Sequence, residues 1–411
     1  MDKSFLTEFK QREYYNQCTD FDALNEILRA KPIRAYIGFD CTAKSLHVGS
    51  LLQIMCLRML QKHGHQPIVL LGGGTTRIGD PSGKEETRKM LSDKEIESNI
   101  KNIKKVFNIF LKTSNTKIKP IFVNNYKWLG KLNYIKFLRE IGKHFTINKM
   151  LSFDSVKLRL DREQSLSYME FNYMILQAYD FLELNKNKNC IMQIGGSDQW
   201  GNIVNGVELI KRYSGKQSFG LTTPLITLAS GAKMGKTESG AVWLDKSLLS
   251  PYDYWQFWRN TDDRDVIKFL KMFTDLSLKK IEEIKNHNIN ELKILLANEA
   301  TAMLHGKSSA EKAEQTAKKT FGSGSVGDDL PTIKIDKKKL ENGMKIIDLV
   351  IVSNLLASKS EVRRIINNKG IKINNQTIED QNLEISLKNF NNHNFLKLSL
   401  GKKKHVIIKI N

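Results

Sequence analysis

The sequence predicts an α/β protein: a parallel sheet covered by helices on both faces, then an α-helical domain and a small C-terminal α+β unit. In the N-terminal part, short apolar runs alternate with amphipathic helical patterns; the runs span residues 34–40, 66–71, 120–124 and 190–194. Strands buried on both faces of a parallel sheet read as continuous apolar runs, and alternation with helices is typical of such sheets. Beyond Pro251 the pattern is helical as far as Thr320.

These patterns divide the chain into five segments. They are an N-terminal helical segment (1–33), the sheet domain (34–245), a helical domain (246–320), a linker (321–345) and a C-terminal unit (346–411). The linker is placed on residues 322–329, because a stretch rich in glycine and serine is typical of a flexible connection.

Composition narrows the protein class. A chain of 411 residues can bury a core in more than one domain. No apolar run approaches the roughly 20 residues of a membrane helix, and the N-terminus shows no secretory signal, so we expect a cytoplasmic protein without membrane association. The four cysteines lack the paired spacing of a zinc site; we expect reduced thiols and no protein-bound metal.

The charge balance favours a polyanionic partner. The chain has 65 basic and 44 acidic residues, a net charge of +21. Basic groups near phosphates release counterions, so such an excess suits nucleic acid. A general bias of the chain towards lysine, isoleucine and asparagine is the alternative explanation. The excess is concentrated at the C-terminus, where residues 350–411 hold 11 basic and 4 acidic residues.

Each predicted strand ends in polar or small residues. Asp40 and Thr42 follow the first run, residues 72–75 the second, Asn125 the third and residues 195–199 the fourth. Ligands of open parallel sheets bind outside the carboxyl ends of the strands. The sequence therefore predicts one shared cleft at this edge of the sheet.

Two short segments suggest phosphate chemistry. The sequence His-Val-Gly-Ser at 47–50 opens the helix after the first strand, and Lys-Met-Gly-Lys-Thr at 233–237 lies in a glycine-containing loop. Histidine, lysine and the backbone N–H groups of a helix start all suit anionic phosphates. The second segment is no phosphate-binding P-loop, because Ser230 replaces the first glycine and a poor helix start follows; residues 79–84 fail the same pattern.

Together these segments resemble the two signatures of class I aminoacyl-tRNA synthetases, His-x-Gly-His and Lys-Met-Ser-Lys-Ser. Ser50 stands in place of the second histidine, while Gly235 and Thr237 replace serines. A glycine at 235 is expected to make the loop more mobile. Longer motifs are similar to the bacterial tyrosyl-tRNA synthetase family; they span residues 36–40, 79–84, 173–180 and 193–200.

The resemblance implies a Rossmann-like catalytic domain and a tyrosine–tRNA ligase. Such an enzyme activates L-tyrosine with ATP to tyrosyl-adenylate and pyrophosphate, then transfers tyrosine to the 3′-terminal ribose of tRNA(Tyr). It further implies ATP as a substrate together with Mg²⁺, no tightly bound cofactor, and a homodimer. The tyrosine carboxylate is itself the nucleophile, so the protein must position two anions and stabilise charge on the phosphates.

The resemblance also assigns residues. Tyr36 and Asp180 would pair with the phenol hydroxyl of tyrosine, while Tyr173, Gln177 and Asp80 would hold its ammonium group. On a helix Tyr173, Gln177 and Asp180 share one face, which supports a common site. Gln193 and Gln199 would lie near the amino-acid carboxylate.

For ATP, the assigned residues are Asp40, Thr42, His47, Gly49, Ser50, Asn125, Gly196, Asp198, Lys233 and Lys236. Among these, Asp198 would accept hydrogen bonds from the ribose hydroxyls. The residues with a catalytic role would be His47, Thr42, Lys84, Arg88, Lys233 and Lys236. The last four of these, three lysines and one arginine, would face pyrophosphate.

Residues 346–411 resemble an alpha-L RNA-binding module. A serine at the start of a basic helix, Ser358, precedes the pair Arg363 and Arg364. The predicted tRNA-binding residues are Arg363, Arg364, Lys369 and Lys372.

Two alternatives remain open. A tryptophanyl enzyme is disfavoured by Tyr36 with Asp180, since an indole offers one donor and needs one acceptor. A non-catalytic RNA-binding protein on a synthetase scaffold is disfavoured because His47, Lys233 and Lys236 are kept.

Overall fold

The computed structural model describes residues 4–80, 90–112, 117–231, 234–237, 240–322, 330–341, 343–390, 395–401 and 404–410. The chain forms two compact units. The first comprises residues 1–235, 243–245 and 262–292, and the second comprises residues 236–242, 246–261 and 293–411.

The first unit is built on a six-stranded sheet with the order β1-β6-β5-β2-β3-β4. The strands are β1 (Gln17–Cys18), β2 (Arg34–Phe39), β3 (Gln66–Leu71), β4 (Ile121–Asn124), β5 (Cys190–Gly196) and β6 (Phe219–Thr223). All pairs are parallel except β1 with β6. The α/β class and the strands β2 to β5 are thus confirmed, while β1 and β6 were not predicted.

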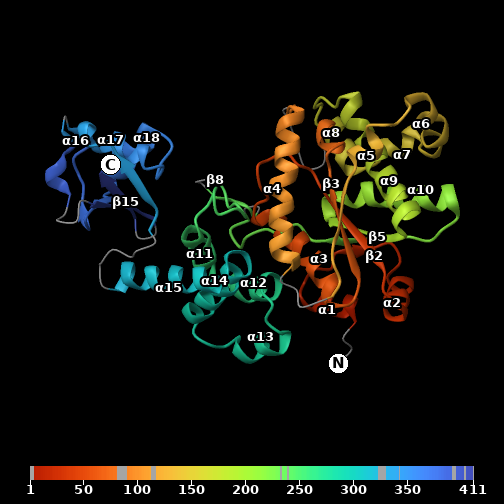
Figure 1. Ribbon diagram of the computed structural model, residues 1–411, viewed down its shortest axis with the longest axis horizontal. Coiled ribbons are helices and arrows are strands. Elements are labelled where there is room, and N and C mark those ends of the chain that lie inside the picture. The colour runs from red at the N-terminus through yellow and green to blue at the C-terminus, as the bar shows by residue number, and fades with distance from the viewer. Residues whose placement is uncertain are drawn as a thin grey trace. The chain divides into compact units, whose positions relative to one another are not determined.

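Helices cover both faces of this sheet (Figure 1). On one face, α9 (Tyr168–Lys188) and α10 (Trp200–Ser214) form a buried cluster with Tyr36, Ile68 and Leu70. On the other face lie α3 (Leu51–Lys62) and α4 (Asp93–Lys112). The chain runs outwards from β2 to β3 and β4 on one side, and β5 and β6 lie on the other. The strand order therefore reverses between β2 and β5, where such sheets bind ligands.

Long helix α9 begins at a well-defined cap. The Ser167 hydroxyl accepts a hydrogen bond from the Glu170 N–H at 3.2 Å, and the Glu170 carboxylate accepts one from the Ser167 N–H at 3.1 Å. This capping box satisfies N–H groups that a helix start otherwise leaves unpaired. A buried ion pair with Arg159 at 3.1 Å fixes the same carboxylate. The inward face of α9 is thereby placed over β2 and β5.

Smaller helices complete the first unit: α1 (Phe5–Gln11), α2 (Phe21–Ala30), α5 (Tyr126–Leu129), α6 (Tyr134–Glu140), α7 (Ile147–Leu151), α8 (Asp154–Asp161), α12 (Val266–Phe273) and α13 (Leu278–Ile284). Arg12 attaches the N-terminal helix, because its guanidinium donates to the carbonyls of Lys271 at 2.8 Å and Leu276 at 2.9 Å. Arg58 of α3 pairs with Asp275. Residues 262–292, which were expected in a separate helical domain, therefore pack within the catalytic unit.

The second unit contains α11 (Pro251–Arg259), α15 (Lys307–Gly322) and most of α14 (Ile289–His305), along with a C-terminal sheet. Trp255 of α11 donates to Asn298 of α14 at 2.7 Å. The hairpin of β7 (Lys236–Thr237) and β8 (Gly240–Ala241) also belongs here.

The C-terminal sheet has five strands in the order β12-β11-β14-β15-β9. These are β9 (Thr332–Ile335), β11 (Ile371–Ile373), β12 (Gln376–Thr377), β14 (Phe395–Leu400) and β15 (Lys404–Ile410), with β10 (Met344–Lys345) and β13 (Glu384–Ile385) forming a separate pair. Helices α16 (Lys337–Glu341), α17 (Ile346–Val352) and α18 (Lys359–Asn367) contribute to its core.

The linker predicted over 321–345 is wrong for residues 332–345. Strand β9 pairs in parallel with β15, and Ile335 and Leu340 are buried in the C-terminal core. The strand is only four residues long and carries two exposed polar side chains, so its alternation was too short to recognise. Among the described residues, no helix is both long and apolar enough to span a bilayer.

Candidate active site

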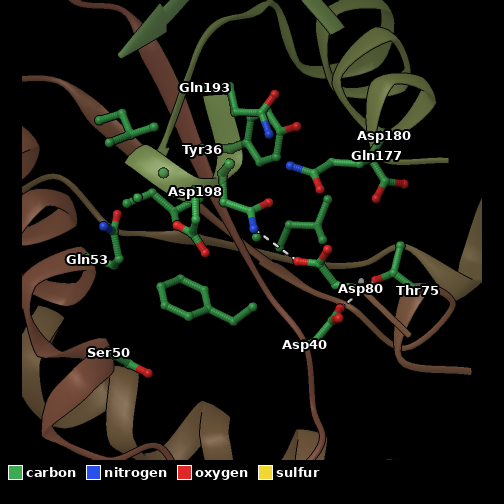
Figure 2. A pocket seen from close by; sticks show the side chains of 18 of the residues that line it. Tyr36, Asp40, Ser50, Gln53, Thr75, Asp80, Gln177, Asp180, Gln193 and Asp198 are labelled. Carbon is green, nitrogen blue, oxygen red and sulfur yellow. Dashed lines mark hydrogen bonds between the residues drawn. The ribbon is translucent and has the colours of Figure 1, made fainter. Parts of the chain in front are cut away.

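A cavity of about 360 Å³ opens at the carboxyl ends of β2 and β5. It lies where the topology places a ligand, and thirteen of the predicted site residues line it. They are Tyr36, Asp40, Thr42, Gly49, Ser50, Asp80, Tyr173, Gln177, Asp180, Gln193, Gly196, Asp198 and Gln199. Figure 2 shows Tyr36, Gln177 and Asp180 at one end of the cavity and Ser50 and Gln53 at the other. We name these the Asp180 end and the Ser50 end.

At the Asp180 end, a buried carboxylate lies beside a buried phenol. Asp180 is 2% exposed and Tyr36 is 1% exposed. The Asp180 oxygens accept hydrogen bonds from Trp128 Nε1 at 2.7 Å and Asn125 Nδ2 at 2.8 Å. Burial nevertheless raises the pKa of Asp180 to about 7. Near neutral pH, the Asp180 carboxyl is therefore ionised in part of the molecules and neutral in the others.

The hydroxyl of Tyr36 has no hydrogen-bond partner among the described residues. Its ring packs on Phe181, with the centroids 5.3 Å apart. Burial and the Asp180 charge raise its pKa well above the ordinary value, so the hydroxyl keeps its proton. A buried hydroxyl without a partner costs free energy unless a ligand supplies the missing hydrogen bond.

Asn125 does not take the place predicted for it. Expected beside the nucleotide, it is fully buried outside the cavity lining. Its Nδ2 donates to Asp180 and, at 3.0 Å, to the Thr75 hydroxyl, while its Oδ1 accepts from Gly74 N–H at 2.7 Å. The strand end was correctly located, but the side chain turns inwards and holds Asp180 in place.

Polar side chains form a network along the wall between the two ends. Gln199 Nε2 donates to Asp80 at 2.9 Å, and Asn202 Nδ2 donates to Gln177 Oε1 at 3.1 Å and Gln199 Oε1 at 3.2 Å. These bonds orient three predicted tyrosine-binding side chains. Asn202 was not predicted as a site residue, because it belongs to none of the recognised motifs.

Asp40 is the centre of a second set of bonds. Tyr173 OH donates to its Oδ2 at 3.1 Å, and Thr75 OH donates to its Oδ1 at 2.8 Å. Tyr173 was expected at the ammonium group and Asp40 at the nucleotide, so the structure joins the two predicted sets. Only glycine fits at position 72, since a Cβ there would lie 2.5 Å from Asp40 Oδ1.

At the Ser50 end, the chain turns from β2 into α3 through a short 3₁₀ turn at Val48–Ser50. His47 Nδ1 accepts the Gly49 N–H at 3.0 Å. His47 is half-buried and is not among the residues that line the cavity, whereas Gly49 and Ser50 line it. Gly196 and Asp198 complete this end, and a Cβ at 196 would lie 2.5 Å from Asp198 Oδ1. Glycine thus leaves backbone exposed at two points where a nucleotide can approach.

Gln53 is a further lining residue at this end, one turn along α3 from Ser50. Its Nε2 donates to Thr223 OH at 2.7 Å, and its buried Oε1 has no partner among the described residues.

Most of the basic residues predicted to face the phosphates lie outside the described residues. Lys84, Arg88 and Lys233 lie outside the described residues, and Lys236 is described as backbone of β7. Gly235 has a φ of +117°, which favours glycine. No group of three or more metal-ligating side chains was found in the described part of the chain.

In the C-terminal sheet unit, the predicted basic residues surround α18. Ser358 caps this helix by accepting the Glu361 N–H at 3.2 Å. Arg363 and Arg364 are exposed on α18, while Lys369 pairs with Glu379 at 2.8 Å. Lys372 is half-buried on β11.

Comparison with known proteins decides the family. Residues 28–322 match the model of class I tRNA synthetases (W and Y), and residues 323–408 match the tyrosine–tRNA ligase SYY-like C-terminal domain. A tyrosine–tRNA ligase from Pelagibacter ubique is 68% identical, covering 99% of both chains, and one from Rickettsia prowazekii is 51% identical over 99% of this chain and 100% of its own.

The chain belongs to the class I tyrosyl-tRNA synthetases. A C-terminally truncated mitochondrial tyrosyl-tRNA synthetase from Aspergillus nidulans agrees in structure. Its TM-score is 0.70 at 30% identity, covering 78% of this chain and 95% of that one. The predicted fold class and ligase function are confirmed, and ATP, tyrosine and tRNA are the substrates of this family.

The buried carboxyl of Asp180 can be tested by measuring how the stability of the fold depends on pH. A carboxyl whose pKa is raised from 3.8 to about 7 binds its proton more tightly in the folded chain, so its ionisation destabilises the fold. Asparagine does not ionise. We expect the unfolding free energy of Asp180→Asn to gain on that of the parent by up to about 4 kcal/mol between about pH 4 and pH 8. Urea unfolding at several pH values measures this.

Glu283→Gln is the control, because this carboxylate is 52% exposed in an ion pair of α13. Its difference from the parent should not follow pH. A pH-independent difference for Asp180→Asn would contradict the buried, proton-binding carboxyl.

Proposed function

We propose that the cavity binds L-tyrosine with its phenol at the Asp180 end and ATP at the Ser50 end. The observation that carries the proposal is the Tyr36 hydroxyl, buried without a partner beside the Asp180 carboxylate. A phenol hydroxyl placed between them donates to Asp180 and accepts from Tyr36. Phenylalanine would leave the Tyr36 hydroxyl unpaired, at a cost of about 1–3 kcal/mol, and would leave Asp180 with only its two protein donors.

The reaction then needs alignment more than acid–base chemistry. A tyrosine carboxylate oxygen attacks the α-phosphorus of ATP, forming the mixed anhydride as the bond to the departing pyrophosphate breaks. Asp80 and Gln177 would hold the ammonium group, and Gln193 and Gln199 the carboxylate. The network through Asn202 keeps several of these side chains oriented before substrate arrives.

On the nucleotide side, Asp198 would accept from the ribose hydroxyls and Gly196 would let the backbone approach. The neutral His47 ring carries its proton on Nε2, because Nδ1 accepts the Gly49 N–H. The Nε2–H group would donate a hydrogen bond to a phosphate oxygen and keep its proton. Lys84, Arg88, Lys233 and Lys236 would face pyrophosphate. Mg²⁺ carried by ATP would neutralise phosphate charge, as is usual for nucleotide substrates.

Tyr36→Phe tests the phenol site directly. Removing an unpaired buried hydroxyl should leave the melting temperature unchanged or raised. The lost hydrogen bond should lower kcat/KM for tyrosine by about 2- to 13-fold, corresponding to about 0.5–1.5 kcal/mol, without lowering it for phenylalanine. ATP–pyrophosphate exchange and thermal unfolding measure the two effects.

Tyr14→Phe is a matched control, since the Tyr14 hydroxyl is also buried but donates to the Met272 carbonyl at 2.6 Å. This variant should lose thermal stability and keep its preference for tyrosine. Tyr36→Phe with unchanged discrimination against phenylalanine would reject the proposed tyrosine orientation.

For the second step, we propose that α18 and β11 of the C-terminal sheet unit bind tRNA through Arg363, Arg364, Lys369 and Lys372. The exposed arginines on the capped helix support this, because guanidinium groups pair well with phosphates. Lys369 already pairs with Glu379, so its contribution is expected to be the smaller.

Replacing Arg363 and Arg364 with alanine should raise KM for tRNA. The slope of the logarithm of tRNA affinity against the logarithm of salt concentration should become shallower, by the equivalent of up to about two phosphate contacts. Pyrophosphate exchange without tRNA should not change. Lys338→Ala with Lys339→Ala, on α16 of the same unit, removes the same charge and serves as control. Equal losses in both double variants would mean a general charge effect rather than a site.

We also propose that the chain acts as a homodimer in the cytoplasm. Exposed apolar side chains on neighbouring stretches of the chain support the dimer, because clusters of them mark interaction sites. They are Tyr134, Ile135, Leu138, Ile147, Leu151, Leu160 and Tyr168, with exposed fractions from 38% to 67%. The Tyr134 and Tyr168 hydroxyls hydrogen bond at 2.8 Å, which joins two of these stretches.

Ile135→Lys with Ile147→Lys should convert the protein to a monomer in sedimentation-velocity experiments, because each lysine would bury an unpaired charge. Leu248→Lys with Val352→Lys, two apolar residues that are also exposed, is the control and should leave the dimer intact. A monomeric parent protein would refute the dimer, and cell fractionation tests the location.

A further inference from the structure

His47 is enclosed by two glycines from distant parts of the chain. A Cβ at Gly49 would lie 2.6 Å from His47 Cε1, and a Cβ at Gly235 would lie 2.7 Å from His47 Nδ1. Gly235 also takes a φ of +117°. The two backbones therefore approach the same edge of the imidazole as closely as residues without side chains can.

Trp243 closes another side of the ring. Its aromatic ring meets His47 edge-on, with centroids 6.2 Å apart and an interplanar angle of 72°. The contact is tied to the backbone, because residues 47 and 243 form an antiparallel bridge and Leu244 N–H donates to the Leu46 carbonyl at 2.8 Å. Residues 243–245 belong to the same compact unit as His47.

We propose that Trp243 is a positioning residue for His47. With Gly49 and Gly235 against one edge and Trp243 against the ring, the imidazole keeps the orientation in which Nδ1 accepts the Gly49 N–H. The Nε2 proton is thereby fixed in direction. This inference rests on the proposed contact of His47 with a phosphate oxygen, and Trp243 itself touches no substrate.

A smaller side chain at 243 leaves the ring free to change its χ2 angle, and the donor is then aimed wrongly in part of the molecules. Misplacement of a catalytic group by about 1 Å costs up to about 100-fold in rate. The defect should therefore appear in kcat, while KM for tyrosine, which binds at the Asp180 end, should remain unchanged.

A double-mutant cycle separates positioning from general packing. In the parent protein, Trp243→Leu should lower kcat for ATP–pyrophosphate exchange by about 10-fold or more, and Trp243→Phe, which keeps an aromatic edge, by less than about threefold. In a His47→Ala background, Trp243→Leu should change kcat by less than about twofold, because nothing is left to position. Circular dichroism and thermal unfolding verify that each variant is folded.

Gly235→Ala gives an independent arm if Trp243→Leu folds poorly. Its Cβ would collide with the imidazole, so kcat should fall in the parent and recover in part when His47→Ala removes the ring. No recovery would mean that backbone strain alone is responsible, which counts against enclosure of the imidazole.

The outcomes separate the two proposals. If His47→Ala leaves kcat unchanged, the proposed role of His47 fails, and the inference fails with it. If His47→Ala impairs the enzyme and Trp243→Leu adds its full loss in that background, only the positioning role of Trp243 is overturned. Non-additive losses with unchanged KM for tyrosine support it.

Discussion

The structure depends on the burial of one carboxylate, that of Asp180. Taking a charge out of water is costly, and the pKa near 7 records the part of this cost that two hydrogen bonds leave uncompensated. The donors, Asn125 and Trp128, come from the end of β4 and from α5. The Tyr36 hydroxyl beside them has no hydrogen-bond partner among the described residues. This end of the cavity therefore contains two groups whose burial costs free energy in the free protein.

Topology explains how this carboxylate comes to face the cavity. Between β2 and β5 the strand order reverses, so the loops after them diverge and leave a cleft. Tyr36 and Asp180 lie on β2 and α9, whereas the Ser50 end is made from the start of α3 and the end of β5. Asp40 links these regions, since its carboxylate accepts from both Tyr173 and Thr75. The two ends of the cavity are therefore joined through one connected set of hydrogen bonds.

Much of this arrangement could be predicted from the sequence. Continuous apolar runs located the strands β2 to β5, and the helical spacing of Tyr173, Gln177 and Asp180 placed them in one cavity. The sequence did not predict the edge strands β1 and β9, because they are too short to show periodicity. Side-chain direction was not predicted either. A residue at the end of a strand, such as Asn125, can turn its amide towards the cavity or towards the core, and the sequence does not distinguish the two. Partners such as Trp128 belong to no motif and follow only from tertiary packing.

Gly235 shows that the residue type at one motif position does not by itself explain what that residue does. Its glycine was interpreted as a source of loop mobility, which the structure does not test. What the structure adds is a steric reason: a positive φ, together with His47 Nδ1 at 2.7 Å from the position of a Cβ, leaves no room for serine. The departure from the usual second signature is therefore matched to the packing of the first. Ser50 differs, because it lines the cavity. The glycine at 235 is thus explained by the fit of two protein segments, whereas the serine at 50 changes the surface of the cavity.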